Sequence, residues 1–175
     1  MVDKIRYKVI FWDFDGVLMD SNAIRNAGFE MVLKDYPKAQ VSKLLEFHNE
    51  NGGLSRYVKF RYFFEEVRGE QITDEDVNKW AGRFSQIMLE NLMNPDLLIQ
   101  DTISYVIKFY KEHDMHIVSG SDGNELKEIC NSTQIAKYFN TINGSPTPKT
   151  DLVSEIVKSN TYNPEDCVLI GDSIN

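Results

Sequence analysis

Residues 9–12, with the sequence VIFW, form a short apolar run that ends directly at two acidic residues, Asp13 and Asp15. A fully apolar run of β-branched and aromatic residues is typical of a parallel strand that is buried on both faces. Open α/β sheets place their functional groups at the carboxyl ends of such strands. Residues two apart in an extended segment point to the same side, so we expect both carboxylates over one spot.

Two carboxylates at one point repel each other. The pair is tolerable where a divalent cation neutralises one of them, or where one carboxyl carries a proton and serves as an acid. Gly16 follows and permits a sharp turn of the chain. The first predicted strand therefore ends in a candidate metal or proton-transfer site.

Further apolar runs alternate with helical patterns along the chain. Together with the first, these runs are residues 8–12, 115–118, a weaker one at 138–142, and 167–170. Strands that alternate with helices are the signature of a parallel sheet built from βαβ units. The pattern therefore predicts an α/β fold with a Rossmann-like core.

The segment between the first two predicted strands is too long for a single crossover helix. Its helical patterns cover residues 22–35, 41–49, 55–67 and 74–93. We therefore expect an α-helical cap, residues 21–93, inserted into a core made of residues 1–20 and 94–175.

Charge and composition exclude several classes of partner. The chain has 175 residues and a formal net charge of -8, and its field would repel nucleic acid and anionic membranes. Cys130 and Cys167 are too few for a disulfide framework, and the N-terminus has no signal-peptide pattern. We expect a cytoplasmic protein that binds neither nucleic acid nor a membrane.

Three more polar positions follow predicted strands or loops. Ser119 and Gly120 end the second strand, where the hydroxyl and the backbone N–H groups of the turn can bind an anion. Lys149 precedes a predicted helix at residues 150–159, and Asp172 follows the last strand. Carboxylates, a hydroxyl and an ammonium group at strand ends suit a magnesium-assisted phosphoryl-transfer site.

Each of these elements has an ordinary explanation when taken alone. Asp-x-Asp after a strand is common turn chemistry, Gly171-Asp172-Ser173 can cap a helix, and single lysines are usually solvated. Their occurrence in order, each behind an apolar run, favours one shared site. Residues 144–150 superficially resemble a P-loop, but their prolines lack the N–H groups that a phosphate cradle needs.

The ordered motifs resemble those of the haloacid dehalogenase-like hydrolase superfamily. Residues 13–17 are similar to its first motif, Ser119 to its second, Lys149 to its third, and residues 171–173 to the start of its fourth. The helical insertion is similar to that of the phosphatase branch with an α-helical cap, which includes phosphoglycolate phosphatases and β-phosphoglucomutases.

The resemblance implies a role for each matching residue. Asp13 would attack phosphorus and form an aspartyl-phosphate, and Asp15 would act as acid and then as base. Mg²⁺ would be held by Asp13, Asp172 and the main-chain carbonyl of Asp15. Ser119 and Lys149 would hold oxygens of the phosphoryl group.

The predicted cap contains a glycine turn followed by basic residues. Arg56 and Lys59 are candidate substrate-binding residues for an anionic or polyhydroxylated leaving group, with Arg61 nearby. The alternative is a glycine turn and helix N-cap with solvated basic side chains. The sequence leaves both interpretations open.

The predicted function is a magnesium-dependent phosphatase that acts on a small phosphorylated metabolite, with a sugar phosphate as one candidate. Two alternatives are a phosphomutase of the β-phosphoglucomutase type and a non-catalytic remnant that binds a ligand or partner. The family's fourth motif continues with a second aspartate and a further strand, whereas this sequence stops at Asn175. We therefore expect a truncated C-terminal part of the core, weakened metal binding, and a monomer or weak homodimer.

Overall fold

The computed structural model of the protein describes residues 5–172, which form a four-stranded parallel sheet in the order β3-β2-β1-β4. The strands are β1 (Val9–Trp12), β2 (Asp114–Asp122), β3 (Thr141–Ser145) and β4 (Cys167–Ile170). β1 lies inside the sheet because it pairs with β2 on one side and with β4 on the other. The predicted α/β class with a parallel sheet is confirmed.

Seven α-helices accompany the sheet within the described part of the chain. They are α1 (Asn22–Val32), α2 (Lys38–Glu50), α3 (Arg56–Tyr62), α4 (Asp74–Leu92), α5 (Gln100–Phe109), α6 (Gly123–Ser132) and α7 (Lys149–Ser159). A π-helical turn (Phe63–Val67) follows α3, and 3-10 turns occupy Pro95–Leu97, Ala136–Tyr138 and Pro164–Asp166. None of the helices between residues 5 and 172 combines the length and the apolar character needed to span a bilayer.

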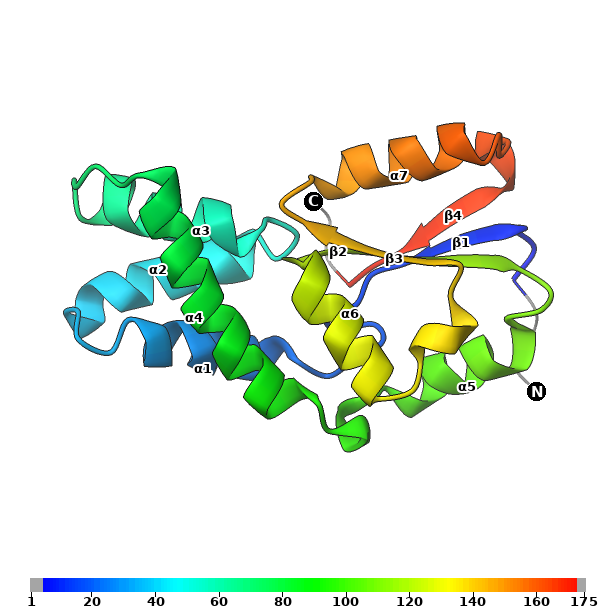
Figure 1. Ribbon diagram of the computed structural model, residues 1–175, viewed down its shortest axis with the longest axis horizontal. Helices are drawn as coiled ribbons and strands as arrows, with labels where there is room; N and C mark the ends of the chain where they lie inside the picture. Colours follow the sequence, from blue (N-terminus) through cyan, green and yellow to red (C-terminus); the bar gives the residue numbers. More distant parts are fainter. Residues whose placement is uncertain (1–4, 173–175) are drawn as a thin grey trace.

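The sheet is covered on both faces, as the continuous apolar run of β1 predicts. Figure 1 shows α7 on one face and α5 and α6 on the other. Val9 and Phe11 pack in the cluster that contains α7, whereas Ile10 and Trp12 belong to the larger cluster on the opposite face. This division follows from the alternation of side chains along a strand.

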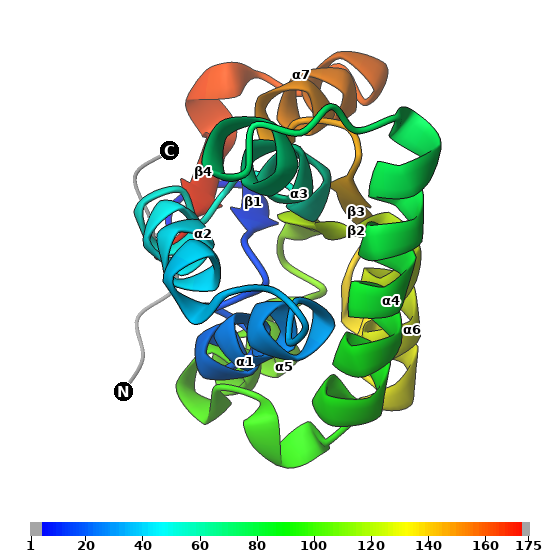
Figure 2. The same ribbon diagram turned by 90° about the vertical axis from the view of Figure 1, so that its left-hand side faces the viewer.

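Helices α1–α4 form the insertion between β1 and β2, and all four were predicted as helices. Figure 1 shows them beyond the carboxyl ends of the strands, and Figure 2 shows α4 lengthwise beside α6. Their interior is an aromatic cluster in which the centroid of the Phe29 ring lies 4.4 Å from that of Phe84 and 5.4 Å from that of Phe60. The insertion therefore places a helical layer over the sheet edge where the predicted site lies.

Two strand predictions need correction. The weak strand predicted at residues 138–142 is a 3-10 turn followed by β3, which begins only at Thr141. Asn140 explains the shift, because its side chain accepts a hydrogen bond from Met115 N at 3.1 Å and ends the turn beside β2. The second strand is longer than predicted and continues through an irregularity in its pairing between Val118 and Asp122.

We expect Phe29→Ala to lower the free energy of unfolding by about 3–5 kcal/mol, because it leaves a void in a packed core. Phe29 is 2% exposed, whereas Met31 on the same helix is 52% exposed. The control Met31→Ala is expected to change stability by less than about 0.5 kcal/mol. Denaturant titration of both variants tests this, and equal losses would contradict the packing described here.

Candidate active site

A cavity of about 260 Å³ lies between the carboxyl ends of the strands and the inserted helices. The structure places every sequence-predicted site residue along its wall: Asp13, Asp15, Arg56, Lys59, Ser119, Gly120, Lys149 and Asp172. The core supplies most of them from the ends of β1, β2 and β4 and from the start of α7, and the insertion supplies the two basic residues from α3. Groups far apart in the sequence thus share one site.

Asp13 is fixed at the end of β1. Its backbone N–H donates to the Ile170 carbonyl of β4 at 2.9 Å, and its side chain is buried. Lys149 Nζ donates to Asp13 Oδ2 at 2.6 Å, and Phe14 N donates to Oδ1 at 2.8 Å. Burial raises the pKa of Asp13, and Lys149 acts in the opposite direction by stabilising the charged form. The two donors therefore keep a buried carboxylate oriented in the cavity.

Asp15 is held by three donors. Arg25 Nε donates to Oδ1 at 2.9 Å, Ser121 Oγ donates to Oδ2 at 2.6 Å, and Ser21 Oγ also donates to Oδ1. Burial opposes ionisation, but Arg25 and the two hydroxyls outweigh it and lower the pKa of Asp15 to about 2. Asp15 is therefore a carboxylate in this arrangement, and it has to leave Arg25 before it can donate a proton.

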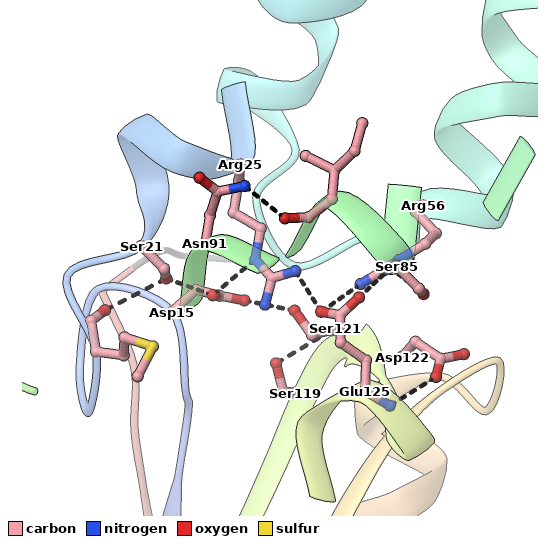
Figure 3. A network of polar contacts seen from close by, with 12 residues as sticks. Asp15, Ser21, Arg25, Arg56, Ser85, Asn91, Ser119, Ser121, Asp122 and Glu125 are labelled. Atoms are coloured by element: carbon pink, nitrogen blue, oxygen red, sulfur yellow. Dashed lines mark hydrogen bonds and ion pairs between the residues drawn. The ribbon is translucent and has the colours of Figure 1, made fainter. Parts of the chain in front are cut away.

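The Arg25 side chain belongs to a buried charge network that joins the insertion to the core (Figure 3). Its Nη1 donates to Glu125 Oε1 at 2.6 Å, and Arg56 Nη2 donates to the same oxygen at 2.9 Å. The exposed fractions of the Arg25, Arg56 and Glu125 side chains are only 5%, 3% and 1%. Glu125 on α6 thus pairs with one arginine from α1 and one from α3.

Sequence reasoning missed Arg25, Ser121 and Glu125. Arg25 and Glu125 are 100 positions apart, and neither belongs to a motif with a spacing that would pair them. In the sequence, Glu125 is an ordinary acidic residue near the start of a helix. Only the structure, in which Arg25 of α1 and Arg56 of α3 reach Glu125 on α6, shows that its charge is buried and paired.

The basic residues of the insertion divide into two groups. Arg61 is partly exposed and pairs with Glu65 at 2.8 Å, so it fits the interpretation as a solvated side chain. Arg56 and Lys59 are buried and line the cavity, so that interpretation is wrong for them. Arg56 is already bound to Glu125 and to Ser85 Oγ, the latter at 2.7 Å.

Lys59 differs from Arg56 because its hydrogen bond is long. Its Nζ donates to the Gly52 carbonyl at 3.3 Å, and the residue is 3% exposed. Burial lowers the pKa of Lys59 to about 7, with only partial compensation from Asp15.

Asp172 lies directly over the turn at Gly16, within the first motif. Asn22 Nδ2 donates to Asp172 Oδ2 at 3.2 Å. Gly16 has a φ of +73°, and a Cβ built on it would lie 2.1 Å from the same carboxylate oxygen. A glycine is therefore needed at position 16 both for backbone conformation and for the approach of Asp172. Ser173, the next residue of the predicted fourth motif, lies outside the described residues.

The donor set at this end of the cavity matches the preference of a hard cation for oxygen ligands. Asp13, Asp15 and Asp172 all line one cavity. Across residues 5–172, no group of three or more His, Cys, Asp or Glu side chains is placed to hold a metal ion. Mg²⁺ binding at Asp13, Asp15 and Asp172 therefore stays a prediction.

The irregular part of β2, where the sequence predicted a turn at Ser119 and Gly120, closes the cavity against the insertion. Ser119 Oγ accepts a hydrogen bond from Ser121 N at 3.1 Å, within the irregular part of the strand. A Cβ built on Gly120 would lie 2.5 Å from the Gly53 carbonyl oxygen. The predicted glycine turn of the insertion therefore touches the core at Gly120.

Comparison with known protein families and structures agrees with this architecture. Residues 9–175 match the profile of the family described as haloacid dehalogenase-like hydrolase. No curated protein sequence matches the chain.

Several solved structures share the fold. β-Phosphoglucomutase from Clostridium difficile aligns with a TM-score of 0.73 and 18% identity, over 95% of this chain and 77% of its own. A predicted phosphoglycolate phosphatase from Haemophilus somnus aligns with a TM-score of 0.68 and 14% identity, over 97% and 79% of the two chains. The magnesium-bound hydrolase YfnB from Bacillus subtilis aligns with a TM-score of 0.66 and 16% identity, over 97% of this chain and 81% of its own. At these identities the likeness establishes the fold.

We expect Glu125→Gln to lower the free energy of unfolding by about 3 kcal/mol or more, because it leaves two buried arginines with one carboxylate fewer. The control is Glu128→Gln on the same helix, where the side chain is exposed and the expected change is less than about 0.5 kcal/mol. Denaturant unfolding measures both. Equal stability of the two variants would show that the network does not hold the insertion to the core.

The pKa of Lys59 makes stability depend on pH. Between about pH 7 and 10.5 the folded protein has lost the Lys59 proton while the unfolded chain keeps it, so stability should rise with pH across this window. We expect wild-type protein to gain stability relative to Lys59→Met between pH 7 and pH 10, measured by denaturant titration in chloride buffers. For the exposed control Lys34→Met, the free energy of unfolding should change with pH as it does in wild type. The same pH dependence in Lys59→Met and wild type would contradict the lowered pKa of Lys59.

Proposed function

Because the chain belongs to the haloacid dehalogenase-like hydrolase family, we propose that it is a magnesium-dependent phosphatase that hydrolyses a small phosphate monoester. The observation that carries the proposal is the buried Asp13 carboxylate, which Lys149 Nζ contacts at 2.6 Å in a cavity that Asp172 and Ser119 also line. A nucleophile, a fixed cation and a hydroxyl that can bind an anion are the parts that phosphoryl transfer needs.

In the first step, an oxygen of Asp13 attacks phosphorus, a new P–O bond forms, and the bond to the leaving alcohol breaks. Lys149 and the Ser119 hydroxyl would hold oxygens of the transferring group and offset its negative charge. Asp13, Asp172 and the Asp15 carbonyl would hold Mg²⁺, which supplies further positive charge at the same place when bound. The product of the first step is an aspartyl-phosphate and an alcohol that has gained a proton.

Asp15 is the candidate source of that proton. In the structure it is a carboxylate paired with Arg25, so acid catalysis requires a movement of the insertion that separates the two side chains. Without Arg25 the pKa of Asp15 would rise, because burial then acts without the opposing cation. In the second step Asp15 would accept a proton from the water that attacks the aspartyl-phosphate, which releases phosphate and restores Asp13.

A phosphomutase is the second candidate, and the likeness to β-phosphoglucomutase favours testing it. A mutase returns the phosphoryl group to a second substrate hydroxyl, so it needs a bisphosphorylated primer and releases little phosphate. Steady release of phosphate without a primer would favour the phosphatase.

The proposed substrate is a small phosphorylated metabolite of the cytoplasm. Cys130 and Cys167 are both free, which fits a reducing compartment. The net charge of -8 remains unfavourable for nucleic acid as a partner.

We expect Asp13→Asn to abolish phosphate release from p-nitrophenyl phosphate, with a loss of at least about 1000-fold, because the amide is not a nucleophile. Release by wild-type protein should depend on added Mg²⁺. Asp35→Asn, at an exposed position of the insertion, is the matched control and should keep wild-type activity. Phosphate release that survives in Asp13→Asn would refute the proposed nucleophile.

A further inference from the structure

We propose that Ser121 is a positioning residue, which keeps the Asp15 side chain in place in the cavity after Arg25 has moved away from it. This inference rests on the proposed phosphatase function and deepens it, because it names the group that holds the proton donor during the reaction. Ser121 acts through Asp15, and no contact with the substrate is assigned to it.

The three donors of Asp15 divide between its two carboxylate oxygens (Figure 3). Arg25 Nε and Ser21 Oγ both donate to Oδ1. Within residues 5–172, Ser121 Oγ is the donor to Oδ2, at a distance of 2.6 Å. One oxygen is therefore held from the start of the insertion, and the other is held from the sheet.

The donors on the two oxygens belong to different parts of the molecule. Arg25 lies on α1 and Ser21 directly precedes that helix, whereas Ser121 lies on β2. Asp15 follows β1, which pairs with β2 in the sheet. A movement of the insertion that separates Arg25 from Asp15 would therefore leave Asp15 and Ser121 together in the core.

The irregular part of β2 fixes Ser121. The residue is 7% exposed, and its backbone N–H donates to Ser119 Oγ at 3.1 Å. Its carbonyl oxygen lies so close to β3 that a Cβ built on Gly144 would be 2.3 Å from it. The pairing of β2 with β3 shifts between Val118 and Asp122, and irregularities of this kind re-aim side chains beside active sites.

Asp15 needs such a partner once Arg25 has left. Its side chain is 21% exposed, and a largely buried polar group without a hydrogen bond is unfavourable. The Ser121 hydroxyl supplies a hydrogen bond from the core and limits rotation of the carboxyl group. Because a misplacement of about 1 Å can cost about 100-fold in rate, this restraint should have a measurable effect on catalysis.

Two substrates that differ in their need for a proton test the proposal. An alkoxide leaves poorly unless it is protonated, so 2-hydroxyethyl phosphate needs Asp15, whereas p-nitrophenolate leaves without a proton. We expect Ser121→Ala to lower the ratio of kcat/KM for 2-hydroxyethyl phosphate to kcat/KM for p-nitrophenyl phosphate by about 10- to 100-fold. The loss should lie in kcat rather than in KM.

Ser154→Ala on α7 is the matched control, because its side chain is exposed, and it should keep the wild-type ratio. Asp15→Asn should lower the ratio by at least as much as Ser121→Ala does. An unchanged ratio in Ser121→Ala would overturn the proposal. An equal loss with both substrates would also overturn it, because that result indicates a general disturbance of the cavity.

A crystal structure separates a failure of this inference from a failure of the proposed function. Arg25→Met imitates the departure of the guanidinium, and we expect Asp15 Oδ2 to stay within hydrogen-bond distance of Ser121 Oγ in this variant. Arg25→Gln serves the same purpose if the Met variant does not fold.

The structural result stands without turnover. If wild-type protein releases no phosphate from either ester, the proposed function fails, and a retained contact between Asp15 and Ser121 would still support the positioning role. A carboxyl group that turns away from Ser121 when the guanidinium is absent would refute that role, whatever the catalytic result.

Discussion

The arrangement of the site depends on the pairing of the buried Glu125 carboxylate with two arginines. Arg25 of α1 and Arg56 of α3 both bind Glu125 of α6, and this pairing fixes the insertion against the core. Arg25 in turn holds Asp15, so the contact that joins the two parts also sets the charge state of a proposed catalytic group. The position of the insertion and the charge of Asp15 are therefore coupled through the Arg25 guanidinium.

The fold was largely predictable because its signals are local. The apolar run of β1 and the helical patterns of the insertion each reflect the burial of one face, and they predicted the sheet and the positions of α1–α4. The third strand was misplaced because Tyr138 and Phe139 have strand propensity, yet they occupy a turn that hydrogen bonds at Asn140 terminate. Tertiary contacts decided that boundary.

The site was predictable where each residue follows a strand. Asp13, Ser119 and Asp172 are placed by the strands themselves, because parallel strands bring their carboxyl ends to one edge. The network of Arg25 and Glu125 was not predictable, since no spacing connects a helix of the insertion with α6. Lys59 was identified as a candidate, but only the structure shows that it is buried and has no carboxylate partner within residues 5–172.

The place of β1 inside the sheet has a consequence for biosynthesis. Val9 pairs with Asp114 of β2 and with Cys167 of β4, so the first strand to leave the ribosome receives its partners only after most of the chain has been made. Until then, its apolar side chains have no sheet to enter, and such late, non-local pairing is slow and prone to aggregation. The proposed nucleophile Asp13 is thus translated early but reaches its place only when β4 docks, because Asp13 N bonds to Ile170 O.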